Sequence, residues 1–237
     1  MQISLLAVFL FILDLVQAED SIVGGRDTTI EEHPFQLSLQ HYGRSACGAT
    51  ILSSNMALTS AHCTDGLSAS SLTVRAGSSF RGQGGQVLQV SKISQHPLYN
   101  PQTHDNDVSV LILSGRIHGA EAHPIGLQPE GAEVSVGTLG TITGWGILSS
   151  GGSQPSQLQE AEVAKISDKQ CQEAYGNITS ITSSMHCFEI QGKGACQGDY
   201  GGPVVIHGVQ VGIISFGKGC ANDDYPGVYT KISNPVI

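Results

Sequence analysis

The sequence is poor in charge, in aromatic residues and in basic clusters. Only 13% of its 237 residues are charged and 5% are aromatic, against about 25% charged residues in an average globular domain. The formal net charge is −9, and no run of Lys or Arg interrupts the chain. Because nucleic-acid binding needs a basic surface, we expect no nucleic-acid partner.

Long apolar runs are scarce as well. The one apolar segment runs from Ile3 to Leu13. A membrane-spanning helix needs roughly 20 residues, so we expect no membrane association. The segment is followed by Val16-Gln17-Ala18, the small-x-small pattern of a signal-peptidase site. We predict a signal peptide at residues 1–18 and a secreted, extracellular, monomeric protein.

Metal-binding patterns are missing too. No CxxC occurs, and no two cysteines have the close spacing of a zinc site. An even number of cysteines in an exported chain favours structural disulfides, of which six cysteines allow 15 pairings. We expect three disulfides, no metal and no cofactor, with the cysteines at Cys47, Cys63, Cys171, Cys187, Cys196 and Cys220.

Short strands and tight turns dominate what is present, with 30 glycines. Alternating or apolar segments predict strands near 35–39, 72–76, 87–90, 107–113, 202–206 and 209–214, and His207-Gly208 between the last two predicts a hairpin. Ser167 with Gln170 forms a capping-box pattern, so one short helix is expected at 167–175. The pattern predicts an all-β protein, either barrels or a sandwich.

Three separated segments carry chemical groups: Thr59-Ser-Ala-His-Cys63, Asp105-Asn-Asp-Val108 and Gly198-Asp-Tyr-Gly-Gly-Pro203. Each alone is weak, because a single His or Asp is usually a surface or turn residue. Together with Ile22-Val-Gly-Gly25 and Gly144-Trp-Gly146, they make the chain resemble the chymotrypsin family of serine proteases, from Ile22 to Lys231.

The resemblance implies two packed six-stranded antiparallel β-barrels, at residues 22–125 and 126–237. It implies a short propeptide at 19–21, although Ser21 is not the usual basic residue. Family members continue into a C-terminal helix, so we expect either that the sequence stops short at Ile237 or that this protein lacks the helix. It also implies the disulfides Cys47–Cys63, Cys171–Cys187 and Cys196–Cys220.

The family's catalytic triad assigns the site residues by position. His62 corresponds to the general base and Asp107 to the carboxylate that orients it. The backbone N–H groups of Gly198 and Tyr200 correspond to the oxyanion hole. Asp199 corresponds to the partner of the amine that cleavage frees at Ile22.

Tyr200 stands where the family has its nucleophilic serine. A phenol oxygen lies about 4 Å farther from the backbone than a serine oxygen, whereas attack needs reacting atoms about 3 to 3.5 Å apart. The ring also fills space meant for the scissile carbonyl. On this argument the sequence predicts no meaningful peptidase activity.

The resemblance also assigns residues to a substrate pocket. These residues differ from those of relatives that cut after Arg or Lys. Gly194 stands at the pocket floor, where those relatives carry an aspartate. The other residues placed in the pocket are Ser215, Phe216, Gly217, Gly219 and Gly227. Asn177-Ile-Thr179 is a separate candidate for N-glycosylation.

These observations favour an inactive secreted homologue, a pseudoprotease that works by binding proteins. The pattern is similar to mite group 3 allergens and to the inactivated serine protease paralogues of scabies mites. That similarity implies interference with host defence, with complement components or protease inhibitors as partners. Two alternatives stay open: an active secreted serine endopeptidase whose Tyr200 is a sequence error, and an inert decoy that competes with active paralogues.

Overall fold

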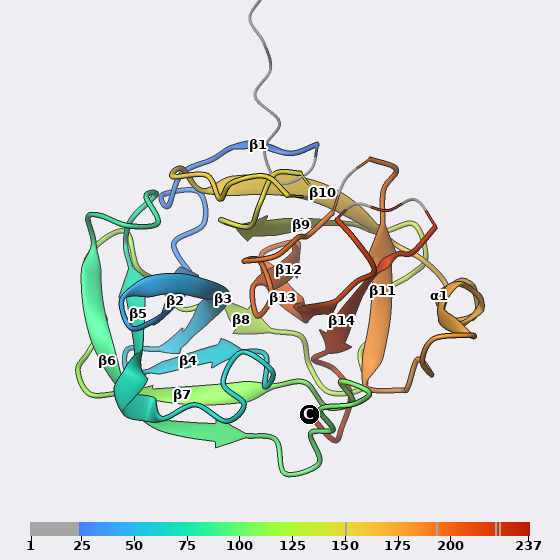
Figure 1. Cartoon of the computed structure of the whole chain (residues 1–237), viewed down its shortest axis with the longest axis horizontal. Coiled ribbons are helices and arrows are strands. Elements are labelled where there is room, and N and C mark those ends of the chain that lie inside the picture. Colours follow the sequence, from blue (N-terminus) through green and yellow to red (C-terminus); the bar gives the residue numbers. More distant parts are fainter. Residues whose placement is uncertain (1–23, 150, 193, 221, 223) are drawn as a thin grey trace, which may run out of the picture.

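Two β-barrels lie side by side in the computed structural model, which describes residues 24–149, 151–192, 194–220, 222 and 224–237 (Figure 1). The predicted signal peptide, the predicted propeptide and Ile22 lie outside the described residues. In the part of the chain that is described, no helix is long and apolar enough to cross a membrane.

The first barrel is closed by six antiparallel strands in the order β2-β3-β4-β7-β6-β5. In β5, Leu72, Val74 and Ala76 are buried and alternate with half-buried residues, the period-2 pattern that sends every second side chain inward. The strands are β2 (Gln36–His41), β3 (Arg44–Ser53), β4 (Met56–Thr59), β5 (Leu72–Ala76), β6 (Gln86–Gln95) and β7 (Ser109–Leu113), with a 3-10 turn η1 (Ala69–Ser71) before β5.

The second barrel closes because β9 pairs with both β10 and β12, giving the ring β9-β10-β11-β14-β13-β12. Its strands are β9 (Leu139–Gly144), β10 (Gln159–Lys165), β11 (Met185–Glu189), β12 (Pro203–Ile206), β13 (Val209–Phe216) and β14 (Gly227–Lys231). The prediction of two six-stranded antiparallel barrels is thus confirmed.

Two short strands attach to the outside of the second barrel. β1 (Arg26–Asp27) pairs antiparallel with β10, and β8 (Gly126–Leu127) pairs parallel with β13. The Arg26 guanidinium also lies 2.6 Å from the Glu160 carboxylate of β10. The start of the predicted first domain therefore joins the sheet of the second barrel.

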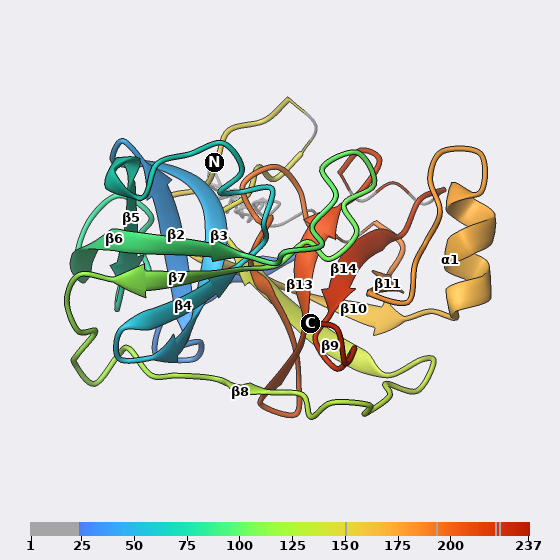
Figure 2. The same cartoon turned by 90° about the horizontal axis from the view of Figure 1, so that it is seen from below.

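Local sequence signals set two elements of the second barrel. Helix α1 (Asp168–Tyr175) begins after Ser167, whose side chain accepts from the Gln170 backbone, and both halves of the capping box are present. His207 and Gly208 have φ values of 49° and 77°. Two positive φ values in succession match the twist of a two-residue hairpin. Figure 2 shows α1 at the outer edge of the second barrel.

The two cores differ in composition. The first barrel encloses Leu, Ile, Val, Ala and Cys side chains. The second adds Phe188 and Tyr229, whose rings pack edge to face with centroids 5.1 Å apart. Tyr200 packs against both cores, so it lies at the junction of the two barrels.

Candidate active site

His62 lies in the turn that follows β4, at the face of the first barrel that meets the second. Its neighbour Cys63 forms a disulfide with Cys47 of β3. This cross-link ties the turn to the barrel wall and so restricts where the imidazole can lie. The pairs Cys171–Cys187 and Cys196–Cys220 also form, which are the pairs that the resemblance implies.

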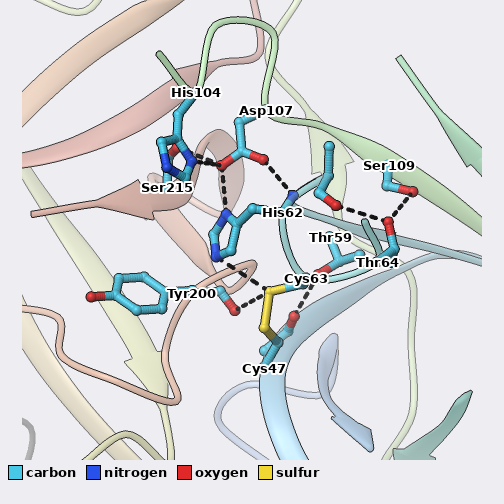
Figure 3. The surroundings of a disulfide bond; sticks show 12 residues. Cys47, Thr59, His62, Cys63, Thr64, His104, Asp107, Ser109, Tyr200 and Ser215 are labelled. Atoms are coloured by element: carbon cyan, nitrogen blue, oxygen red, sulfur yellow. Dashed lines mark hydrogen bonds and ion pairs between the residues drawn. A yellow bond between two sulfur atoms is a disulfide. The ribbon is translucent and has the colours of Figure 1, made fainter. Parts of the chain in front are cut away.

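The Asp107 carboxylate holds the His62 turn through two atoms. It accepts from the His62 backbone N–H at 2.8 Å, and its Oδ2 lies 2.8 Å from the His62 Nδ1 (Figure 3). Asp107 is fully buried, whereas the His62 side chain is 21% exposed. The imidazole is thus fixed on its inner side and partly accessible to solvent on the other.

The second barrel holds Asp107 in turn. Ser215 of β13 donates to the Asp107 Oδ2 at 2.6 Å, and Thr230 of β14 donates to the Asp107 carbonyl oxygen at 2.8 Å. Burial opposes the charge of the carboxylate, but the surrounding His104, His62 and Ser215 outweigh it, so the pKa of Asp107 lies well below its ordinary value. Asp107 therefore stays ionised and keeps the Nδ1 proton on His62.

Ser215 corrects one prediction. Sequence reasoning places it in the substrate pocket, but its hydroxyl points at Asp107 and it does not line the pocket. The same reasoning misses Thr230 and His104. A hydroxyl 123 residues from Asp107 in the chain leaves no local signal. For His104 the one available pattern is a second histidine three residues before the carboxylate.

Tyr200 lies in the turn before β12, beside His62. The two rings meet edge to face with centroids 5.4 Å apart, and the Tyr200 carbonyl oxygen accepts from the Gly48 N–H at 2.8 Å. Figure 3 shows the phenol oxygen pointing away from the imidazole. Burial raises the pKa of the Tyr200 phenol, so the group is a neutral phenol at physiological pH.

Asp199 is completely buried next to Tyr200. Its carboxylate accepts from the backbone N–H groups of Gly146 at 2.7 Å and Cys196 at 3.0 Å. Burial raises the pKa of Asp199 to about 6, because two neutral donors do not replace the lost hydration. A side chain at Gly144 or Gly146 would overlap the carboxylate, which explains the Gly-Trp-Gly motif.

A pocket opens beside Tyr200 in the second barrel. The predicted residues Gly194, Phe216, Gly217, Gly219 and Gly227 line it together with Tyr200. Asn177 lies elsewhere, exposed in the turn after α1. The sequence-predicted pocket is therefore assembled in space, apart from Ser215.

Comparison with known proteins decides the family. The family described as Trypsin matches residues 22–237. This chain belongs to the trypsin family. It is 42% identical over 222 residues to Trypsin beta of Drosophila erecta, covering 93% of this chain and 87% of that protein. It is 43% identical to Trypsin delta of Drosophila melanogaster, with coverage of 92% and 87%. It is also 40% identical to the Vitellin-degrading protease of Bombyx mori, with coverage of 90% and 81%.

These relatives contradict the prediction of a protein without peptidase activity. That prediction rests on Tyr200 alone, whereas proteins named as trypsins match more than nine-tenths of the chain. The interpretation as an inactive binding protein that interferes with complement is therefore wrong, and the alternative of a serine endopeptidase is favoured. These three relatives are insect proteins, so they do not show the finer resemblance to mite allergens or the loss of an ancestral serine.

Proposed function

We propose that this trypsin-family protein is a secreted endopeptidase that hydrolyses peptide bonds in protein substrates. The observation that carries the proposal is the chain of contacts Ser215–Asp107–His62, which fixes one imidazole nitrogen and leaves the other facing the junction of the barrels. A histidine held in this way is a general base for acyl transfer. Protein inhibitors of proteases are further partners for the same cleft.

The turn at Gly198 to Tyr200 supports the proposal through its backbone. Among the described residues, the N–H groups of Gly198 and Tyr200 donate no hydrogen bond. Gly198 has φ 102°, a conformation that favours glycine. Two N–H groups left unpaired at the site can receive the negative oxygen of a tetrahedral intermediate, a contribution of about 3 to 4 kcal/mol per donor.

The nucleophile depends on residue 200. A serine codon and a tyrosine codon can differ by one base, and with serine the site is a complete triad. With Tyr200, whose oxygen points away from His62, the nucleophile is a water molecule. His62 takes a proton from it, the water oxygen attacks the scissile carbonyl carbon, the C–N bond breaks, and His62 returns the proton to the leaving amine. Sites without the nucleophile retain about 10³ to 10⁴ over the uncatalysed rate.

The pocket indicates which substrates fit. Gly194 and Ala195, at the floor position, carry no charge, and Phe216 and Tyr225 supply apolar walls. Among the described lining residues only Glu189, at the end of β11, is acidic, and the floor position itself offers no carboxylate. A buried Arg or Lys side chain without a carboxylate partner there is costly. We therefore assign a preference for an apolar, neutral residue before the cleaved bond, in contrast to cleavage after basic residues.

Export and processing complete the proposal. The apolar segment and the small-x-small pattern support removal of residues 1–18, and removal of 19–21 frees the amine of Ile22. Asp199 supports this second step, because a buried carboxylate with only two backbone donors gains from a cation.

The test begins with resequencing the codon for residue 200 and then measures hydrolysis of peptide libraries by the processed protein. We expect slow cleavage after apolar residues that is lost in His62→Ala, with no fluorophosphonate label if residue 200 is Tyr and stoichiometric label if it is Ser. Hydrolysis no faster than in His62→Ala, together with no label, would overturn the proposal.

A further inference from the structure

His104 lies next to the catalytic histidine, in the segment between β6 and β7. Its backbone has φ 56°. This is the left-handed region, which a non-glycine residue rarely occupies. The ring packs edge to face on His62, with centroids 5.4 Å apart, and tilted on Phe216, also at 5.4 Å. The strained conformation thus places an imidazole at the edge of the site, which is the pattern of a functional position.

The Nδ1 atom of His104 is buried and has no hydrogen-bond partner among the described residues. The distance from this atom to the Asp107 Oδ2 is 3.7 Å. That separation is too long for a hydrogen bond. Buried polar atoms in native proteins are nearly always satisfied, so an unpaired nitrogen aimed at a carboxylate is available to hold a ligand. Figure 3 shows His104 beside Asp107, with this nitrogen directed at the carboxylate.

His62, His104 and Asp107 bring three metal-ligating atoms within 4.8 Å of one another. The two histidine side chains are 21% and 33% exposed, whereas Asp107 is fully buried. The two imidazole rings are thus partly exposed, whereas the ligating His104 Nδ1 is buried. An ion therefore enters through small rotations of the two rings.

We propose that His62, His104 and Asp107 form an inhibitory Zn²⁺ site. Two imidazoles and a carboxylate, with water in the fourth position, are a common zinc ligand set. Zinc–ligand distances of about 2.0 to 2.2 Å place adjacent tetrahedral ligand atoms about 3.4 Å apart. The 3.7 Å separation of the His104 and Asp107 atoms is already close to that value, so small side-chain rotations complete the site.

The ion blocks catalysis through the tautomer of His62. Zn²⁺ binds a ring nitrogen that carries no proton. When it takes Nδ1, the ring proton resides on Nε2, the nitrogen that faces the substrate. That nitrogen then has no lone pair with which to accept a proton from the nucleophile. This inhibitory effect rests on the proposed endopeptidase function, whereas the binding itself does not.

Two other clusters of ligating groups within the described residues are less suitable. Cys47 and Cys63 lie near His62, but their disulfide leaves no thiolate. Glu32 and His33 meet at Glu160, but the Glu160 carboxylate is neutralised by Arg26 at 2.6 Å. A bound cation there would have to displace a cationic side chain.

Calorimetric titration of the full chain with Zn²⁺ at pH 7 tests the proposal. We expect one site in the unmodified protein and in His118→Gln, an exposed histidine outside the cluster. In His104→Gln, affinity should fall at least about tenfold, the scale on which even supporting residues affect metal sites. Equal affinity in His104→Gln and His118→Gln, or no saturable binding, would show that His104 is only a packing residue and would overturn the site.

Two further readouts separate folding and function from binding. Thermal unfolding without metal should be the same for His104→Gln and the unmodified protein, and Co²⁺ should give the visible absorption of a tetrahedral site only when His104 is present. Zn²⁺ should slow peptide hydrolysis, and a chelator should restore it. Binding in a protein that hydrolyses no peptide would preserve the metal site and reject the proposed endopeptidase, whereas hydrolysis unaffected by bound Zn²⁺ would reject the inhibition.

Discussion

The two barrels divide the work of the site unequally. The first supplies His62 and Asp107 from segments that flank strands of an aliphatic barrel. The second supplies Tyr200, the pocket and the hydroxyls that hold Asp107, and its interior includes the fully buried His186 and Asp199. Both barrels bury polar side chains, such as Ser38, Thr50 and Thr59 in the first. The proposed base thus belongs to the first barrel, while the proposed pocket belongs to the second, which also buries the ionisable His186 and Asp199.

The largest expected effect comes from residue 200. It tests whether the groups supplied by the two barrels form an active site once a serine is present. Tyr200→Ser should raise the turnover number by up to about 10⁶-fold, because loss of the nucleophile alone costs about 2 × 10⁶ in a related triad. Steady-state hydrolysis of an apolar peptide measures this, with Tyr200→Ala as the control that removes the ring without adding a hydroxyl. Equal rates in the two variants would mean that the rest of the site is misplaced.

The disulfides offer a matched comparison between the barrels. Cys47–Cys63 and Cys171–Cys187 both close a separation of 16 residues. Replacing either pair with alanine should therefore cost about 3 kcal/mol in the free energy of unfolding. Denaturant titration measures that loss. In the Tyr200→Ser background, only the first replacement should also lower turnover, because only Cys63 adjoins His62. A similar loss of turnover from both replacements would contradict the local role of Cys63.

The buried His186 makes the stability of the second barrel depend on pH. Burial, helped by Lys165 and Lys231, lowers the pKa of His186 to about 3, and neither ring nitrogen has a hydrogen-bond partner among the described residues. The unfolded chain, with an ordinary pKa near 6.5, binds the proton first as pH falls, so the fold loses stability below about 6.5, by about 3 kcal/mol between pH 7 and pH 4.

His186→Phe should remove that part of the acid sensitivity, because phenylalanine keeps a ring against Phe188 and has no proton to bind. Denaturant midpoints at pH 7 and pH 4 measure the change. The exposed His123→Phe serves as control and should leave the acid sensitivity as it is. An unchanged pH dependence in His186→Phe would place the acid-sensitive group elsewhere.

The smallest effect is confined to the outer edge of the second barrel. Ser167→Ala removes the side chain that caps α1 and should lower stability by about 1 kcal/mol. Because α1 lies far from the first barrel in Figures 1 and 2, turnover in the Tyr200→Ser background should not change. Ser167→Asp, which can cap the same helix, should restore the stability; failure to do so would argue against the capping box.

The features that the sequence predicts correctly are those set by residues close together in the chain. The capping box at Ser167, the turn at His207-Gly208 and the strand at Leu72–Ala76 each depend on neighbouring residues, and each forms as predicted. The resemblance to a known family supplies the barrels and the positions of His62 and Asp107. Contacts across long stretches of chain, such as Thr230 with Asp107 and β1 with β10, leave no periodicity to detect.

The error about activity has a physical source. The prediction of inactivity depends on one property, the reach of the Tyr200 oxygen. It gives no weight to the many other positions at which the chain matches its relatives. His104 shows the opposite failure: a histidine three residues before a carboxylate is common, and only a positive φ and a buried nitrogen mark it as unusual. Neither feature can be deduced from residue types.

The pairing of β1 with β10 has a consequence for the order of assembly during synthesis. All six strands of the first barrel have left the ribosome once Leu113 is clear, so that barrel can close while the rest is still being translated. Arg26 must then wait for Glu160, 134 residues later, before it finds its partner. β1, the first described strand to be synthesised, is thus among the last to pair. Its pairing requires that β10 of the second barrel has already been synthesised.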